Sequence, residues 1–216
     1  MHKESTILLS TAYLPPIEYM ALFIKYENVI IEKNETYPKQ TYRNRCKIMS
    51  ANGILKLPIP VNKPHGNNTK ISEITISNTD LWSINHWRAI NSAYSGSPFF
   101  LYYKDDLIKF YSGKYHNLLE FNTELINVLL SLIGVVCNLS YSKSFQLPNT
   151  ISNDFRFSIS PKKENNSYFF KKYVQVFSNK YEFIPNLSII DLLFNLGPET
   201  KDYLENISNQ LVTSDW

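Results

Sequence analysis

The pattern of apolar and polar positions predicts a strand, a helix and a second strand at the start of the chain. Residues 6–12 form an apolar run typical of a buried strand, which the sequence Tyr-Leu-Pro-Pro at 13–16 ends. Apolar residues recur at helical spacing over 17–24, and a second apolar run covers 29–31. Such a βαβ unit favours a parallel pair of strands. The loop around 12–15 is then expected at the carboxyl end of the sheet, where open α/β sheets bind ligands.

The middle of the chain is predicted to hold a hairpin followed by helices. Asn52-Gly53 separates two alternating runs within 48–61, which is a strong signal for a β-hairpin. Residues 71–77 alternate and predict a further strand. Helices are then expected over three segments, 82–94, 98–111 and 117–133. Asn78, Thr79 and Asp80 offer a cap for the first helix, and Gly134 ends the last one.

The final third of the chain is less regular. Residues 149–166 are polar and predict a long loop, 173–177 predict a short strand, and 189–196 predict an amphipathic helix followed by a short polar helix or tail. The whole pattern predicts an α/β fold. Its parts are a mainly parallel Rossmann-like sheet begun by the βαβ unit, an inserted β-hairpin and a helical C-terminal half. A length of 216 residues fits one large domain or two small ones.

Composition excludes several functional classes. The net charge of +3 is too small to imply nucleic acid as a partner. The sequence has neither of the common glycine-rich nucleotide loops, and Cys46 and Cys137 lack metal-ligand spacing, so neither a zinc site nor any particular cofactor is indicated. The start of the chain has too short an apolar run for a signal peptide, and the apolar run 126–136 is too short to span a bilayer. We therefore expect a cytoplasmic protein without a membrane span.

A basic stretch at 37–48 is the first candidate for chemistry. It carries four cations and no Asp or Glu. Arg43 and Arg45 are two residues apart, so on an extended chain their guanidiniums face the same way and suit a bidentate grip on phosphate or carboxylate. Tyr42 and Asn44 beside them suit a sugar or a ribose. In the alternative interpretation, the arginines pair with structural carboxylates and the phenol and amide fix the loop by bonding its backbone.

His86 is the second candidate, in the first half of the helix predicted over 82–94. Its neutral imidazole suits a general base near neutral pH. The alternative is a histidine that makes a structural hydrogen bond. Asp191 is a lone acid in an apolar helix and a candidate partner for one of the arginines. We predict that one cleft brings together residues from separate segments of the chain: Tyr13, Arg43, Asn44 and His86.

Short sequence blocks along the chain carry a family resemblance. They include Ala-Tyr-Leu-Pro-Pro-Ile-Glu-Tyr at 12–19 and Tyr-Arg-Asn-Arg-Cys-Lys-Ile at 42–48, and further blocks lie at 54–61, 86–90, 98–100, 117–122 and 184–199. In this order they resemble the WbqC-like protein family over nearly the full length, which implies a single domain over 1–216. Residues 154–162 resemble the short, Bacteroidetes-type variant of that family.

The resemblance implies a role in surface-polysaccharide biosynthesis of the O-antigen type. The implied activity is that of a transferase moving an amino-acid or acyl group to a sugar or sugar nucleotide. The alternative is a non-catalytic binding or assembly protein of a glycan pathway. The expected partner is an anionic small molecule, such as a nucleotide sugar or an acyl donor, with no metal. His86 is then the predicted catalytic residue, and the predicted substrate-binding residues are Tyr13, Tyr42, Arg43, Asn44 and Arg45.

Overall fold

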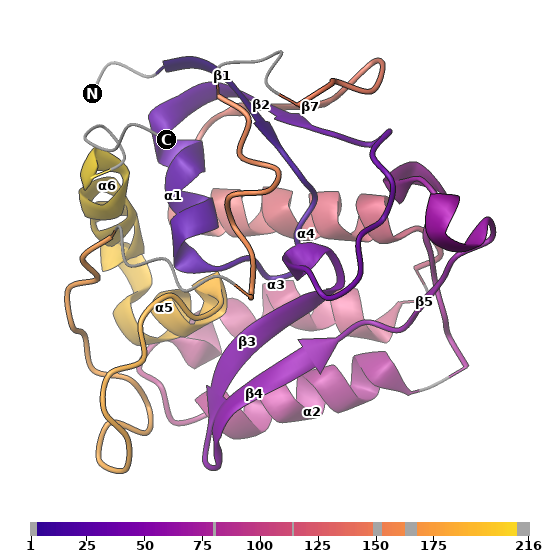
Figure 1. Ribbon diagram of the computed structural model, residues 1–216. Coiled ribbons are helices and arrows are strands. Elements are labelled where there is room, and N and C mark those ends of the chain that lie inside the picture. The colour runs from indigo at the N-terminus through magenta and orange to yellow at the C-terminus, as the bar shows by residue number, and fades with distance from the viewer. Residues whose placement is uncertain (1–3, 80, 114, 149–152, 163–167, 211–216) are drawn as a thin grey trace.

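A parallel sheet forms the upper layer of the molecule (Figure 1). The computed structural model describes residues 4–79, 81–113, 115–148, 153–162 and 168–210. The sheet has the strand order β1-β2-β7, and its strands are β1 (Glu4–Leu9), β2 (Tyr26–Ile31) and β7 (Asn138–Tyr141). Helix α1 (Ile17–Lys25) connects β1 to β2, and the two strands pair in parallel. The predicted βαβ unit is therefore confirmed.

Two small antiparallel sheets and five further helices complete the described chain. The strands are β3 (Arg45–Ser50) with β4 (Gly53–Pro58), and β5 (Val61–Asn62) with β6 (Thr75–Ile76). The helices are α2 (Trp82–Tyr94), α3 (Phe100–Ser112), α4 (Leu118–Ile133), α5 (Ile189–Leu196) and α6 (Thr200–Gln210). The mixed α/β class and the helical C-terminal half are as predicted. None of the helices in these described ranges is long and apolar enough to cross a membrane.

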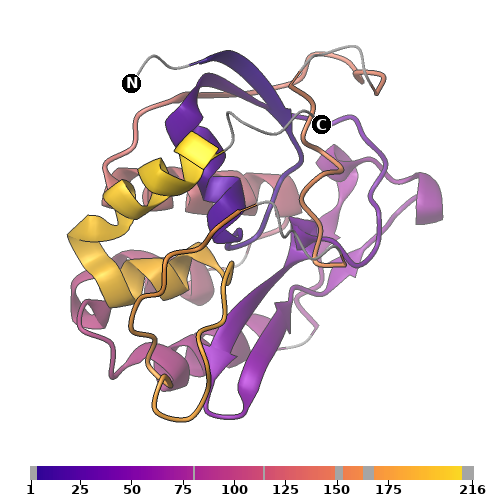
Figure 2. The same ribbon diagram turned by 60° about the vertical axis from the view of Figure 1, so that its left-hand side comes forward.

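One face of the parallel sheet is buried and the other is partly open. Along β2, Val29 and Ile31 are buried, whereas Asn28 and Ile30, which alternate with them, are only partly buried. Figures 1 and 2 show α1 and α4 on the same side, beneath the sheet. A doubly wound fold places helices on both faces of its sheet. The Rossmann-like part of the predicted fold therefore stays a prediction.

The loop between β1 and α1 is held by the distant segment that precedes α5. The amide of Ile17 donates to the carbonyl of Leu187 (3.1 Å), and the side-chain oxygen of Asn186 accepts from the amide of Glu18 (3.0 Å). Asn186 thus caps α1, which has no side-chain cap of its own. These bonds fix the backbone next to Tyr13.

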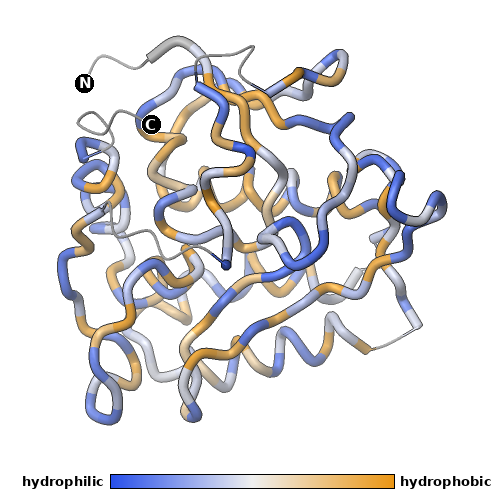
Figure 3. The backbone as a smooth tube through the Cα atoms, viewed as in Figure 1, coloured by the Kyte–Doolittle hydropathy of each residue, from blue (hydrophilic) through white to orange (hydrophobic). Residues whose placement is uncertain are grey.

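The hairpin β3–β4 has a core face and a cationic outer face. Its turn uses Gly53 at φ 94°, a left-handed conformation that glycine adopts without steric cost. Cys46 and Ile48 are buried, while Arg45 and Lys47 alternate with them and are partly exposed. The alternation of hydrophobic and hydrophilic residues along the hairpin is visible in Figure 3. Strand β3 contacts α2 and α5.

Several predicted elements differ from the structure. Residues 71–77 hold a 3-10 helix at Ile71–Glu73 and only the short β6. No strand forms at 173–177, where side chains bond to α5 instead of the backbone pairing with another strand. Strand β7 was not predicted. The N-cap of α2 is Leu81, whose side chain cannot cap, and Asp80 lies outside the described residues.

The predicted polar loop at 149–166 is described only at 153–162. This part contains no helix or strand, but Leu8 and Asp154 form an isolated parallel bridge. The amide of Leu8 donates to the carbonyl of Asn153 (3.0 Å), and the amide of Phe155 donates to the carbonyl of Leu8 (3.0 Å). The segment therefore runs beside β1, at the free edge of the sheet.

Candidate functional site

A chain of buried phenols joins the loop after β1 to helix α2. The hydroxyl of Tyr13 lies 2.9 Å from Nδ1 of His86 and 2.9 Å from the hydroxyl of Tyr111. The rings of Tyr13 and His86 stack with their centroids 5.7 Å apart, and Trp82 meets the imidazole edge-on at 5.2 Å. Two residues predicted to share a site, Tyr13 and His86, are therefore in direct contact.

The imidazole of His86 is neutral, and its Nδ1 bonds the hydroxyl of Tyr13. Burial lowers its pKa to about 4, although the backbone of Pro58 opposes that shift. His86 also lines an open depression of about 710 Å³, whose other lining residues are Pro58, Pro60, Thr79, Leu81, Trp82 and Asn85.

Arg43 is a buried residue whose charge is compensated. Its Nε and Nη2 donate to the two carboxylate oxygens of Glu35 at 2.9 and 2.8 Å, and Nη2 also contacts Oγ of Ser10. The side chain of Arg43 is 5% exposed, so this bidentate pair is nearly free of water. Glu35 lies two residues before the acid-free stretch 37–48 and was missed by a search confined to that stretch. Arg43 thus has the kind of carboxylate partner that the structural alternative expects, and its role in substrate binding stays a prediction.

A second buried arginine, Arg156, lines a small cavity together with Arg43. It donates to Asp154 at 2.9 and 2.6 Å and contacts Glu32 at 3.5 Å. The cavity lined by Arg43 and Arg156 at the carboxyl end of β1 has a volume of about 10 Å³. That is room for about one water molecule. This cavity therefore has no space for a nucleotide or a sugar.

Arg45, unlike Arg43, has no acidic partner among the described residues. In the part of the chain that the structure describes, no carboxylate bonds it, and its buried Nε has no acceptor. Burial raises the pKa of Tyr37, and the nearby guanidiniums of Arg45 and Arg43 oppose that rise, which places Arg45 close to this phenol. Arg45 lies directly opposite Pro58 in the hairpin, and Pro58 lines the depression beside His86. A partly buried guanidinium with an unpaired N–H is a donor suited to an anion.

The sequence on either side of Arg45 is strongly cationic. Residues 36–72 contain no Asp or Glu and seven cations, which are Lys39, Arg43, Arg45, Lys47, Lys56, Lys63 and Lys70. Lys47 and Lys56 lie directly opposite each other in the hairpin, an arrangement that costs stability on its own. Partial desolvation and the neighbouring ammonium of Lys39 lower the pKa of Lys63. An anion near this hairpin would relieve the repulsion between its cations.

Tyr42 and Asn44 fix the loop that carries the arginines. The carbonyl of Tyr42 accepts from the amide of Tyr13 (2.9 Å), and Nδ2 of Asn44 donates to the carbonyl of Ile59 (2.7 Å). Asn122 of α4 adds a hydrogen bond to the carbonyl of Arg43 (2.8 Å). Oδ1 of Asn44 is buried without a partner in the described chain. The amide of Asn44 therefore keeps one acceptor free for a donor group.

Asp191 does not pair with an arginine. Its carboxylate accepts hydrogen bonds from Tyr94 (2.9 Å), Tyr173 (2.5 Å) and Gln175 (3.0 Å). Burial raises its pKa, and these three donors oppose the rise. The expected partnership with Arg43 or Arg45 is wrong, because phenols and an amide satisfy this carboxylate inside the core.

The predicted cleft of four residues is therefore divided in two. Tyr13 and His86 meet, and Arg45 lies opposite Pro58, which lines the same depression as His86, but Arg43 and His86 line different cavities. Sequence reasoning missed the contact of Tyr111 with Tyr13 and that of Arg156 with Glu32, because these partners are far away along the chain. Within the described residues, no group of three or more His, Cys, Asp or Glu could hold a metal ion.

Comparison with known proteins places the chain in a family. The profile of the WbqC-like protein family matches residues 11–180 and 162–203. The chain belongs to the WbqC-like protein family. The matched residues include both the Tyr13–His86 contact and Arg45.

A relative of similar length is found in Mycobacterium tuberculosis. Uncharacterized protein Rv1507c is 28% identical over 229 aligned residues, which cover 93% of this chain and 97% of that protein. No solved structure matches this WbqC-like chain. The family assignment thus rests on sequence, and neither comparison names a substrate.

Proposed function

We propose that this WbqC-like protein acts in surface-polysaccharide biosynthesis of the O-antigen type, and that Arg45 binds the anionic part of a nucleotide sugar or an acyl donor. The observation that supports this proposal is the state of the Arg45 guanidinium. It is partly buried, its Nε lacks an acceptor, and no carboxylate in the described chain neutralises it. Phosphate and carboxylate are the groups whose geometry a guanidinium matches best.

The other residues of the proposed site have supporting roles. Tyr42, Arg43 and Asn44 hold the loop at the start of β3, so that Arg45 is presented in one orientation. The lysines of the hairpin add charge for a ligand with more than one negative group, such as a diphosphate. Tyr13 holds His86 beside the open depression, which has room for a sugar.

The proposed reaction transfers an amino-acid or acyl group to a sugar or sugar nucleotide. A sugar amine or hydroxyl attacks the acyl carbon, the new C–N or C–O bond forms, and the bond to the donor's leaving group breaks. The nucleophile's proton passes to Nε2 of His86, the ring nitrogen that does not face Tyr13. In that tautomer Nδ1 donates to Tyr13, and Tyr13 donates to Tyr111, so the phenol chain supports the exchange.

A second function is favoured by one specific observation. Nδ1 of His86 bonds the buried Tyr13, and the lowered pKa makes the imidazole a weak base. These are features of a structural histidine. They support a non-catalytic binding or assembly protein of a glycan pathway, which would use the same anion site at Arg45.

A panel of ligands tests the proposal. Nucleotides, nucleotide sugars and acyl donors are screened by thermal shift, because a ligand that binds only the folded state raises the melting temperature. We expect anionic donors to raise the melting temperature of the wild type but not that of Arg45→Gln. Arg88→Gln changes an exposed arginine on α2 and is the matched control, in which the rise should be kept. The absence of any shift, or an equal shift in Arg45→Gln, would refute the anion site.

The two candidate functions are then separated with His86→Gln. For an enzyme, this variant still binds the donor but no longer forms an acylated sugar, as followed by mass spectrometry. If the protein is an assembly protein, His86→Gln still copurifies with a partner protein of the glycan pathway.

A further inference from the structure

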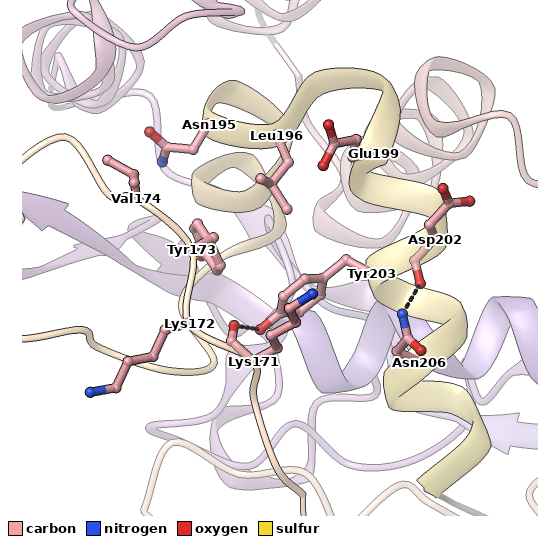
Figure 4. A pocket seen from close by; sticks show the side chains of 10 residues that line it. All are labelled: Lys171, Lys172, Tyr173, Val174, Asn195, Leu196, Glu199, Asp202, Tyr203 and Asn206. Atoms are coloured by element: carbon pink, nitrogen blue, oxygen red, sulfur yellow. Dashed lines mark hydrogen bonds between the residues drawn. The ribbon is translucent and has the colours of Figure 1, made fainter.

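A cavity of about 510 Å³ lies between the last two helices and residues 171–174, and it shares no residue with the Arg45 and His86 site (Figure 4). Helices α5 and α6 and the turn between them form one side, and the extended segment forms the other. The lining residues are Lys171, Lys172, Tyr173, Val174, Asn195, Leu196, Glu199, Asp202, Tyr203 and Asn206. A volume of this size is typical of small-molecule sites.

Two tyrosines give the cavity a fixed aromatic wall. The hydroxyl of Tyr173 donates to the buried carboxylate of Asp191 (2.5 Å), which ties the extended segment to α5. The hydroxyl of Tyr203 donates to the carbonyl of Lys171 (2.7 Å), so α6 holds the same segment, as Figure 4 shows. The two rings meet edge-on with centroids 5.5 Å apart. The wall is therefore ordered before any ligand arrives.

The rim of the cavity carries polar groups without ion-pair partners. Glu199 and Asp202 on one side and Lys171 and Lys172 on the other are exposed, and none of the four forms an ion pair in the described chain. The formal charges of these four side chains cancel. The side-chain nitrogen of Asn195 donates to the carbonyl of Asp191 (2.7 Å), which leaves its oxygen as an acceptor. The rim thus offers acceptors and donors without a net charge.

We infer that this cavity binds an uncharged sugar residue. Aromatic rings pack against the apolar C–H face of a sugar, while carboxylates, amides and ammonium groups bond its hydroxyls. A nucleotide diphosphate would not gain from a rim whose charges cancel, in contrast to the cationic surroundings of Arg45. The assignment rests on the proposed function for the expectation that the ligand is a glycan unit, and the cavity would hold the acceptor or the growing glycan.

Saturation-transfer NMR tests the site with uncharged monosaccharides and disaccharides at millimolar concentration. We expect signals from at least one sugar. Binding should weaken about tenfold in Glu199→Gln and in Asp202→Asn, since each loses a charge-assisted hydrogen bond. It should be lost in Val174→Trp, because Val174 is 78% exposed at the cavity and a larger side chain there closes it without disturbing the core. Asp105→Asn, an exposed acid on α3, is the matched control and should bind as the wild type does.

The outcomes separate this inference from the proposed function. Sugar signals that disappear in the cavity variants but persist in Arg45→Gln support a separate sugar site. Signals that are absent for every sugar, or unchanged in all three cavity variants, overturn it. Thermal unfolding of each variant identifies any loss of sugar binding that comes from misfolding. Asp202→Asn changes an exposed residue to one of the same shape, so it is expected to fold and its sugar binding can be compared directly with that of the wild type. If the anionic donors fail to bind at Arg45 while sugars still bind here, the proposed donor site fails and the sugar site stands.

Discussion

The hydroxyl of Tyr13 and Nδ1 of His86 lie 2.9 Å apart although 73 residues separate them in the sequence. This contact joins the loop at the carboxyl end of β1 to helix α2. Tyr13→Phe removes the hydroxyl and leaves a buried imidazole nitrogen unpaired. We expect the free energy of unfolding to fall by about 1–3 kcal/mol, measured by urea denaturation. Tyr102→Phe on α3 is the control, because that side chain is 77% exposed, and no change is expected. Equal stability of Tyr13→Phe and the wild type would show that the contact contributes nothing.

The lowered pKa of His86 predicts a pH dependence of stability. Its folded pKa is about 4 against an ordinary value of 6.5. Between these values the unfolded state binds a proton that the folded state does not, so the contribution is complete above 6.5 and falls as the pH falls toward 4. The loss amounts to about 3 kcal/mol. The difference in unfolding free energy between wild type and His86→Gln, measured from pH 7.5 to 4, should shrink by that amount.

Other groups titrate in the same range, so a matched control is needed for His86. Leu101→Ala alters an exposed side chain that carries no titratable group. The difference between wild type and Leu101→Ala should stay constant over the same range of pH. A constant difference for His86→Gln as well would mean that burial does not lower the pKa of His86 in the folded protein.

The Arg43–Glu35 pair is predicted to act in folding and not in ligand binding. Both side chains are nearly buried, so removing one partner leaves an uncompensated charge inside the protein. Arg43→Gln and Glu35→Gln should each cost about 3–5 kcal/mol. The double variant should cost clearly less than the sum of the two, as measured by a double-mutant cycle in urea. Additive losses would show that the two groups are not coupled.

Gly197 between α5 and α6 is predicted to tolerate no side chain. Its φ is 55°, and an added Cβ would lie 2.5 Å from ring carbons of Phe99. Gly197→Ala should lower the unfolding free energy by about 2–4 kcal/mol through backbone strain and overpacking. Gly96→Ala is the control, since nothing lies within 4 Å of its added Cβ, and we expect a change of less than about 0.5 kcal/mol. A Gly197→Ala protein as stable as the wild type would contradict the tight packing of Phe99 against the turn.

The sequence predicted the elements whose side chains follow a clear period. The βαβ unit, the hairpin with its Asn52-Gly53 turn, and helices α2, α3, α4 and α5 are confirmed. Strand β7 was missed because its segment Asn-Leu-Ser-Tyr is short and mostly exposed, and only pairing with the distant β2 makes it a strand. The strand predicted at 173–177 does not form, although the segment alternates. The side chains of Tyr173 and Gln175 bond Asp191, and the backbone there pairs with no described strand.

The candidate site was predictable in its residue types but not in its partners. The two arginines at positions 43 and 45 look equivalent in the sequence, yet among the described residues only Arg43 has a carboxylate partner. The buried side chain of Arg43 bonds Glu35. Arg45 is the first residue of β3, where buried and partly exposed side chains alternate, and its own side chain lies on the partly exposed face. That difference depends on the backbone turn at Tyr42–Asn44, which no local pattern indicated.

The most direct test of the anion site is titration calorimetry with inorganic pyrophosphate, the charged part of a nucleotide sugar. Wild type, Arg45→Gln and Arg88→Gln are compared at low ionic strength, where exposed charges are least screened. We expect wild type and Arg88→Gln to bind with the same affinity and Arg45→Gln to bind about tenfold more weakly or not at all. Equal affinity in all three proteins, or no binding to the wild type, would contradict the assignment of Arg45 as the anion-binding residue.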